Sequence, residues 1–280
     1  MTKDIKIGSV MIGGDHPFVL IAGPCVIESK RVVMDIARKL KEMTSRHRIP
    51  FIFKASYDKA NRTSRRSFRG VGIDAGLDIL QGIRQKLRIP VTSDVHTVEE
   101  AQRAGAVLDL VQIPAFLCRQ TDLLCQAGRT GKPVNIKKGQ FLAPWDMKHA
   151  IEKVTSTGNR KIILTERGTT FGYNNLVTDF CSLAIMRRTG YPVVLDASHS
   201  VQQPGGLGQA SGGRSEFIPL MARCGMAAGC NGLFMEVHSN PGQALSDAAN
   251  MLSLKRLDGI LGTLKKLDSL VRRERKSGCP

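Results

Sequence analysis

Three basic residues come at or just after the end of an apolar run, at Lys54, Lys137 and Arg167 of this 280-residue chain. Arginine binds phosphate oxygens through two parallel hydrogen bonds, and lysine supplies a compact positive charge. These residues therefore predict a site for a substrate that carries phosphate or carboxylate groups. The other apolar runs end in a thiol, an amide, an imidazole or a carboxylate: Cys25, Asp94, Gln112, Glu166, Asp196, His199 and Glu236.

A second set of residue types suits a divalent transition metal. Thiolate, imidazole and carboxylate groups bind such ions and leave room for water or substrate. The candidate ligands are Cys25, His199, Glu236 and Asp247, with Asp196 and His238 as replacements for any of them. These residues are far apart in the sequence, so an alternative stays open: a half-buried thiol, a histidine bound to a carbonyl group and two acids on the surface.

Polar residues near the same strand ends could hold the hydroxyl groups of a sugar. Asp94 and Asn61 supply a carboxylate and an amide, although Asp94 could instead cap the helix that begins near Thr97. Lys138 is predicted to belong to the solvated surface, because alternation along a strand turns only one of Lys137 and Lys138 inward.

The elements that must position these residues alternate regularly between strand and helix. Eight apolar runs predict buried strands: 18–22, 51–55, 89–93, 108–113, 134–137, 161–165, 193–195 and 232–236. Segments with helical periodicity follow them, among them 74–87, 117–127, 143–154, 176–188, 217–228 and 254–275. This pattern predicts one α/β domain over residues 1–280, a (β/α)8 TIM barrel whose strand ends all meet at one rim.

Both ends of the chain fall outside this alternation. Residues 1–14 predict a short β-hairpin that closes the bottom of the barrel, and residues 271–280 form a basic C-terminal tail. Two long connections, residues 56–72 and 198–215, leave the rim and are typical of binding loops.

The chain is strongly basic, with 41 lysines and arginines against 24 acidic residues and a formal net charge of +17. A small anionic substrate explains this charge better than nucleic acid, because the basic residues are spread along the chain and aromatics make up only 5%. No apolar stretch approaches the ~20 residues of a spanning helix, and no secretory segment follows the first charges. Seven cysteines without a C-x-x-C pair argue against a structural zinc site. We expect a cytoplasmic enzyme without a membrane partner.

Seven stretches of the chain, between about residues 5 and 260, resemble the 3-deoxy-D-manno-octulosonate 8-phosphate synthase family. The K-A-N-R segment separates this family from the related heptulosonate synthases. The stretches are IAGPCVIES (21–29), KASYDKANRTS (54–64), TSDVHT (92–97), QIPAFLCRQTDLL (112–124), KKGQFLAPWDM (137–147), TERGTTFGYNNLVTD (165–179) and LDASHSVQQPGG (195–206).

The resemblance implies a barrel enzyme, usually a homotetramer, that acts as a transferase in lipopolysaccharide inner-core sugar biosynthesis. It would condense phosphoenolpyruvate with D-arabinose 5-phosphate and water to give 3-deoxy-D-manno-octulosonate 8-phosphate and phosphate. The family has a metal-dependent and a metal-independent class, and the cysteine of the G-P-C turn matches the first. By that match a divalent ion (Mn, Fe, Co, Zn or Cd) is held by Cys25, His199, Glu236 and Asp247.

The same match implies roles for the remaining residues. Phosphoenolpyruvate would bind Lys54 and Lys59 with its carboxylate, and Lys137, Arg167 and the backbone of Ala115 with its phosphate. The pentose hydroxyls would bind Asn61 and Asp94, and its phosphate Arg62 and Ser64, which the neighbouring subunit could supply. Further substrate contacts are implied for Gln112, Gln140 and Gln202. The catalytic roles would fall to His199 and Asp247, which move protons, with Cys25 and Lys59.

Two other enzyme activities stay open at this point. A heptulosonate-type synthase would use a different sugar acceptor, and a metal-dependent aldolase on the same barrel also needs a divalent ion and phosphate-binding residues. Lys54, Lys59 and Arg62 favour a synthase over an aldolase, because they supply positive charge for a second anionic substrate.

Overall fold

The computed structural model describes residues 1–62, 64–206 and 211–276. Eight parallel strands close into a barrel, in which β14 pairs with both β3 and β11. Each strand is buried along its whole length, because helices cover the outside and side chains fill the inside. The predicted (β/α)8 barrel is confirmed. Its strands are β3 (Val19–Gly23), β4 (Phe51–Lys54), β5 (Val91–Asp94), β6 (Leu110–Ile113), β7 (Val134–Lys137), β8 (Ile162–Glu166), β11 (Val193–Asp196) and β14 (Gly232–His238).

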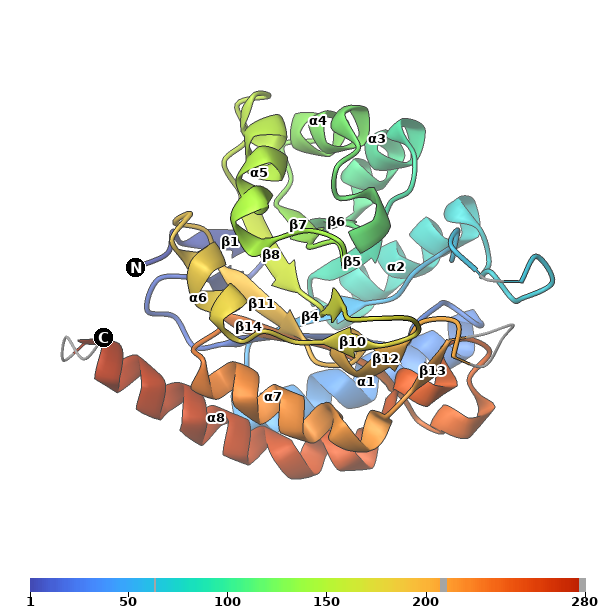
Figure 1. Ribbon diagram of the computed structural model, residues 1–280. Helices are drawn as coiled ribbons and strands as arrows, with labels where there is room; N and C mark the ends of the chain where they lie inside the picture. Colours follow the sequence, from blue (N-terminus) through green and yellow to red (C-terminus); the bar gives the residue numbers. More distant parts are fainter. Residues whose placement is uncertain (63, 207–210, 277–280) are drawn as a thin grey trace.

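Eight helices surround these strands (Figure 1). Three begin at side-chain caps, since Ser29 accepts a hydrogen bond from Val32 N, Thr97 accepts one from Glu100 N and Ser253 accepts one from Arg256 N. The helices are α1 (Lys30–His47), α2 (Ile73–Leu87), α3 (Val98–Val107), α4 (Thr121–Arg129), α5 (Met147–Thr155), α6 (Cys181–Arg187), α7 (Ile218–Ala227) and α8 (Leu254–Lys276).

The N-terminal segment forms the predicted hairpin from β1 (Ile5–Ile7) and β2 (Val10–Ile12). Its four apolar side chains point into a buried cluster with inward residues of the barrel strands, including Val19, Ile52 and Phe234. Gly8, in the turn, lies against Pro90, which precedes β5. The hairpin therefore closes the barrel at the end where the strands begin, opposite the rim of strand ends.

The segment 176–188 corrects a sequence prediction. Only Cys181–Arg187 is helical, and Leu176–Val177 forms strand β10, which pairs with β9 (Thr169–Thr170). Asp179 accepts a hydrogen bond from Cys181 N at 2.8 Å, and this contact places the start of α6 after the hairpin. β12 (Gln202–Gln203) pairs antiparallel with β13 (Gly212–Gly213), and β15 (Leu252–Ser253) pairs parallel with the end of β14.

The predicted basic tail is largely helical, because α8 continues to Lys276. Arg272 pairs with Asp268 at 3.0 Å, and Arg275 donates a hydrogen bond to the Gly229 carbonyl. Residues 277–280 of the predicted tail lie outside the described residues.

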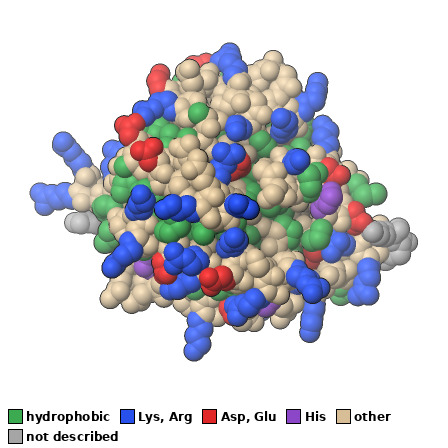
Figure 2. Space-filling model, turned by 180° about the vertical axis from the view of Figure 1, so that it is seen from behind, with side chains coloured by type: hydrophobic (Ala, Val, Ile, Leu, Met, Phe, Trp, Pro, Cys, Tyr) green, Lys and Arg blue, Asp and Glu red, His purple; other side chains and the backbone are tan. Residues whose placement is uncertain are grey.

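The surface carries basic side chains over most of the face shown in Figure 2, with acidic side chains between several of them. None of the helices among the described residues has the length and apolar character needed to cross a membrane. The six cysteines in this part of the chain are free thiols, of which Cys25, Cys118 and Cys230 are buried.

Candidate functional site

One layer of polar side chains lines the rim of the barrel. Four of its residues come two positions after an inward apolar residue, as Lys54 follows Ile52 and Glu236 follows Phe234, and the other two come two positions after the buried polar residues Thr92 and Asn135. Since side chains in a strand alternate between its faces, residues two apart point the same way. The layer holds Lys54, Asp94, Gln112, Lys137, Asp196 and Glu236, with exposed fractions of 0–6%.

Three of the four predicted metal ligands converge at this rim. Cys25, Glu236 and Asp247 each offer one ligand atom, and these atoms lie within 4.8 Å of one another. The Cys25 Sγ atom lies 3.4 Å from Asp247 Oδ2. Glu236 Oε2 is buried and has no hydrogen-bond partner among the residues that the structure describes. An unpaired buried carboxylate oxygen beside a thiol and a second carboxylate fits a divalent cation.

The fourth predicted ligand, His199, lies beside this group. Its Nε2 atom is 3.8 Å from Glu236 Oε2, and its Nδ1 atom is 2.7 Å from Asp196 Oδ2. A carboxylate on one ring nitrogen of a histidine orients the other nitrogen toward a metal. Asp196 also binds Lys137 at 2.6 Å, so its position suits this orienting role rather than that of a replacement ligand.

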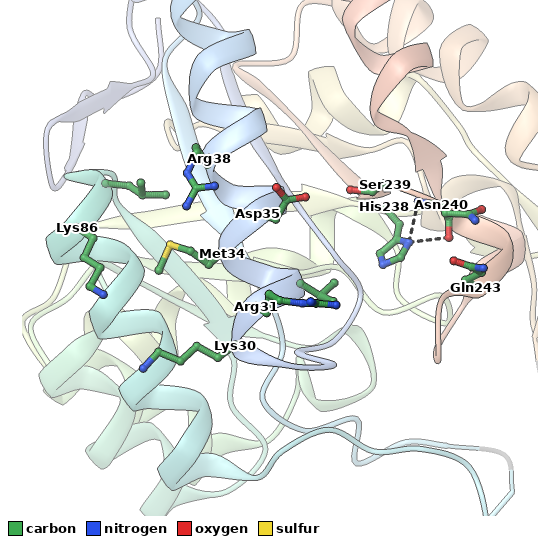
Figure 3. Close-up of a pocket in the computed structure, with 12 residues that line it drawn as sticks. Lys30, Arg31, Met34, Asp35, Arg38, Lys86, His238, Ser239, Asn240 and Gln243 are labelled. Atoms are coloured by element: carbon green, nitrogen blue, oxygen red, sulfur yellow. Dashed lines mark hydrogen bonds between the residues drawn. The ribbon is translucent and has the colours of Figure 1, made fainter.

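The second replacement ligand, His238, lies elsewhere. Its ring contacts Asn240 and lines a groove of about 900 Å³ on the outside of the barrel (Figure 3). The groove lies between α1, the end of α2 and the segment after β14, and its cations are Lys30, Arg31, Arg38 and Lys86. The candidate ligands Cys25, Glu236 and Asp247 lie at the rim and do not line this groove.

Buried charges shift the pKa values of the ligand groups. Burial, followed by the charges of Asp247 and Glu236, raises the pKa of the Cys25 thiol to about 12. Burial also acts to raise the pKa of Glu236, but Lys54 and His199 outweigh it and hold that pKa well below its usual range. A bound cation would favour the Cys25 thiolate, because it offsets the surrounding negative charge.

Two lysines neutralise Glu236. Lys54 Nζ lies 2.6 Å from Glu236 Oε1 and donates to the carbonyl oxygen of Cys25 at 2.8 Å. Lys59 Nζ lies 3.7 Å from the same carboxylate oxygen. Burial lowers the pKa of Lys59, but the nearby Cys25, Asp94 and Glu236 outweigh burial and raise it. The Lys59 ammonium group therefore stays positive at neutral pH beside the predicted metal ligands.

Two more cations form the opposite part of the rim. Lys137 Nζ lies 3.6 Å from the centre of the Phe234 ring, and burial lowers the pKa of this lysine. Arg167 donates to Gln202 Oε1 at 2.7 Å, while its Nη1 atom is buried and unpaired within the described part of the chain. Gln140 is also buried, and its Oε1 atom is likewise unpaired. These atoms leave donors and an acceptor available to a ligand.

The residues expected to bind a pentose phosphate do not form one group. Asp94 is buried and accepts a hydrogen bond from Ser56, whereas the Asn61 side chain is exposed. Ser64 accepts a hydrogen bond from the backbone of Arg66 at 3.3 Å, within its own loop. Asn61 thus faces solvent and Ser64 contacts its own loop, whereas Asp94 lies in the buried layer of the rim.

Arg62 lies among the predicted metal ligands. Its guanidinium is 3.0 Å from Asp247 Oδ1 and 3.8 Å from Cys25 Sγ, and it also contacts the Ser246 hydroxyl. A positive charge here compensates the carboxylate of Asp247.

The remaining predicted contacts follow β6. Gln112 ends the inward row of that strand and accepts a hydrogen bond from Asn135 Nδ2 at 3.4 Å. Ala115 begins the short 3-10 helix η1 (Ala115–Leu117) directly after the strand. Its backbone therefore lies just beyond the end of β6, on the side of the rim.

Several polar residues near the site were missed by reasoning from the sequence. His96 bridges Asp94 at 3.2 Å and Glu100 at 2.9 Å, and Tyr57 donates to the same Glu100 carboxylate at 2.8 Å. The signal was present in the T-S-D-V-H-T stretch, where His96 follows Asp94 by two positions. Asp58 also lies near His96 and Glu100. Its carboxylate pairs with Arg69, which balances its negative charge.

The prediction that Lys138 is solvated was wrong. Its side chain points to the outer face of the barrel wall, as alternation requires, but it is completely buried there. In a parallel barrel the outer face of each strand is covered by helices and loops, so turning away from the interior does not expose a residue to water.

Comparison with known proteins places the chain in a family. Residues 2–273 match the DAHP synthetase I family. The chain is similar to the 2-dehydro-3-deoxyphosphooctonate aldolase of Geobacter sulfurreducens, with 56% identity over 97% of this chain and 100% of the relative. The proteins of that name from Geotalea uraniireducens and Trichlorobacter lovleyi are 57% and 55% identical over the same shares. With this match over nearly its whole length, the chain belongs to the DAHP synthetase I family.

Proposed function

We propose that this protein condenses phosphoenolpyruvate with D-arabinose 5-phosphate and water. The products are 3-deoxy-D-manno-octulosonate 8-phosphate and inorganic phosphate, an activity that matches the name of its relatives. The observation that carries the proposal is the convergence of buried Lys54, Lys137 and Arg167 at one barrel rim. Glu236 and Asp196 offset Lys54 and Lys137, whereas the buried Nη1 atom of Arg167 has no partner among the described residues, and the phosphate of the substrate would supply one.

Phosphoenolpyruvate would lie across the rim. Arg167 and Lys137, with the backbone of Ala115, would hold its phosphate, since Arg167 Nη1 has no partner among the described residues. Lys54 and Lys59 would lie near its carboxylate. Two separate groups of cations fix the orientation of a ligand with an anion at each end.

The pentose phosphate would lie above it, toward the loop that follows β4. Asp94 and Asn61 would bind hydroxyl groups, and Gln112, Gln140 and Gln202 would supply further contacts. Arg62 and Ser64 would bind the pentose phosphate. For Arg62 this requires its guanidinium to leave Asp247, from which it lies 3.0 Å.

A divalent metal ion would be held by Cys25, His199, Glu236 and Asp247. The donor set of sulfur, nitrogen and oxygen suits Mn, Fe, Co, Zn or Cd. When bound, such an ion supplies Lewis acidity or lowers the pKa of a water molecule. These residues also act on one another without the ion. Lys54 and Lys59 would hold Glu236 ionised, and Asp196 would orient His199.

The reaction would then follow from orientation and charge neutralisation. The methylene carbon of phosphoenolpyruvate attacks the aldehyde carbon of the pentose, and water adds to the neighbouring carbon, giving a hemiketal phosphate that expels phosphate. His199 and Asp247 are the candidates for moving protons in these steps. Fixing two reactants side by side supplies several kcal/mol of rate enhancement, roughly 7–11 in the best-oriented cases.

A coupled assay tests this function. Purified protein loaded with a divalent metal should release phosphate from phosphoenolpyruvate only when D-arabinose 5-phosphate is present. Mass spectrometry should detect the eight-carbon product. Erythrose 4-phosphate serves as the matched control: faster turnover with it would favour a heptulosonate synthase, and substrate cleavage without phosphate release would favour an aldolase.

We also propose that the protein forms a homotetramer in the cytoplasm. Five exposed aromatic side chains support subunit contacts, because exposed apolar groups often mark interfaces. They lie on segments that follow β6, β7 and β8: Phe116, Phe141, Trp145, Phe171 and Tyr173. Sedimentation of the purified protein at several concentrations measures the number of subunits.

A further inference from the structure

Lys138 is a buried cation behind the phosphate-binding part of the rim. Its Nζ atom lies 3.1 Å from the Leu142 carbonyl oxygen, 3.5 Å from the Gly139 carbonyl oxygen and 3.0 Å from Thr169 Oγ1. The first two contacts close the turn that follows β7, and the third reaches the hairpin that follows β8. One ammonium group thus joins two neighbouring segments of the rim.

Glu166 is the counter-ion of this lysine. Its Oε1 atom lies 3.5 Å from Lys138 Nζ and accepts hydrogen bonds from the backbone N–H groups of Arg167 at 3.0 Å and Gly168 at 2.8 Å. Its Oε2 atom accepts a hydrogen bond from Ser182 in α6 at 2.6 Å. Gly168 has φ of +92°, a left-handed conformation that the chain adopts directly after Arg167.

The same two segments carry the atoms that are free to bind a ligand. Gln140 belongs to the turn closed by Lys138, and Arg167 belongs to the turn held by Glu166. Thr170 N donates to the Gln140 carbonyl at 3.0 Å and links the two turns directly. Gln140 Oε1 and Arg167 Nη1 are both buried without partners in the described part of the chain.

We propose that Lys138 and Glu166 are positioning residues for the phosphate-binding pair Arg167 and Gln140. The inference rests on the proposed function for the identity of the ligand, the phosphate of phosphoenolpyruvate. Neither residue points into the barrel, so neither touches the substrate. They hold the backbone from which Arg167 and Gln140 extend, and small displacements of a binding group reduce affinity and rate sharply.

The principal test replaces Lys138 by methionine, which keeps the length of the side chain and removes its charge and hydrogen bonds. The Lys138→Met variant should raise the KM for phosphoenolpyruvate at least tenfold and change the KM for D-arabinose 5-phosphate less than twofold. Lys161→Met is the matched control, because Lys161 is an exposed lysine at the opposite end of β8. It should leave both constants unchanged.

A double variant separates positioning from loss of stability. Lys138→Met leaves Glu166 as a buried charge without its counter-ion, so its Tm should fall, and Lys138→Met/Glu166→Gln should recover most of that loss. The KM for phosphoenolpyruvate should stay raised in the double variant, because the hydrogen bonds of Lys138 to the two turns are still missing. All measurements are made well below the Tm of each variant, with folding checked by circular dichroism.

Three results would overturn the inference: an unchanged KM for phosphoenolpyruvate in folded Lys138→Met, equal increases for both substrates, or full recovery of this KM in the double variant. Failure of the proposed function is distinguished from these results by the unmodified protein. If it releases no phosphate from phosphoenolpyruvate and D-arabinose 5-phosphate, the function itself is wrong.

Discussion

Lys137 and Lys138 are adjacent in the sequence, but they face opposite sides of the barrel wall. Lys137 points inward, pairs with Asp196 and lies over the Phe234 ring, whereas Lys138 points outward and pairs with Glu166. Both are buried, and each ammonium group has a buried carboxylate within 3.5 Å. At this scale the alternation of the strand decides which lysine can meet a substrate, and a counter-ion makes each burial tolerable.

The metal proposal is tested at the scale of one residue by Cys25→Ala. We expect this variant to lose its divalent metal and most of its activity, because the thiol is one of three ligand groups within 4.8 Å of one another. Metal content is measured by elemental analysis and activity by phosphate release.

Cys181→Ala is the matched control, since this thiol is exposed at the start of α6 and is not one of the predicted metal ligands. It should keep both metal and activity. Full turnover by Cys25→Ala in the presence of a chelator would refute the role of the metal.

Strands and turns, rather than single residues, bring the site together. β14 carries Phe234 inside the barrel, Glu236 at the rim and His238 at its end, so one strand links the core, the ligand group and the outer groove. The hairpin of β1 and β2 fills the other end with apolar side chains. The barrel therefore has a polar rim and an apolar base.

The hairpin should contribute to stability and not to catalysis. Ile7 is fully buried in the interior cluster, so Ile7→Ala should lower the free energy of unfolding by about 2–5 kcal/mol, the usual cost of removing a large aliphatic side chain from a core. Denaturant titration measures this loss. The kcat of the folded variant should stay unchanged, and a large drop in kcat at full folding would contradict the separation of base from rim.

The buried charges of the rim have polar or charged partners, whereas the surface of the molecule carries an excess of positive charge. The chain carries a formal net charge of +17, yet Lys54, Lys59 and Lys137 each have a carboxylate beside them at the rim, and Arg167 donates a hydrogen bond to Gln202. The excess positive charge thus belongs mainly to the surface, where it is spread over the face in Figure 2. A surface of this kind attracts small anions without forming one defined binding stripe.

The pH dependence of global stability should reflect His96. Burial lowers the pKa of this imidazole, but hydrogen bonds to Asp94 and Glu100 outweigh burial and raise the pKa from 6.5 to about 9. A pKa that is raised on folding stabilises the protein fully below pH 6.5, and this contribution is lost as the pH rises through about 9. The shift corresponds to about 3 kcal/mol. We expect the free energy of unfolding to fall by up to this order between these two pH values.

Urea unfolding at a series of pH values measures this effect, with His96→Gln as the comparison. The variant should be less stable at pH 6.5 and should show a flatter profile, because it has no ionisable ring. Parallel profiles for the two proteins would show that His96 is not the group responsible.

The sequence alone determined the barrel and several of the residues that line its rim. Alternating apolar runs and helical periodicity are local signals, and a period of two residues decides which side chain of each strand points inward. Lys54, Lys137 and Glu236 could therefore be assigned to one rim before their distances were known. The motif around Cys25 likewise pointed to a metal ligand before its partners were located.

Only the tertiary structure decided how these residues pair. Asp196 pairs with His199, Arg62 lies against Asp247, and Lys138 is buried behind the rim. Each outcome depends on contacts of a few ångströms, often between residues far apart in the chain, or on what covers the outer face of a strand. Local periodicity carries no information about either, because it describes the direction of a side chain and not what that side chain meets.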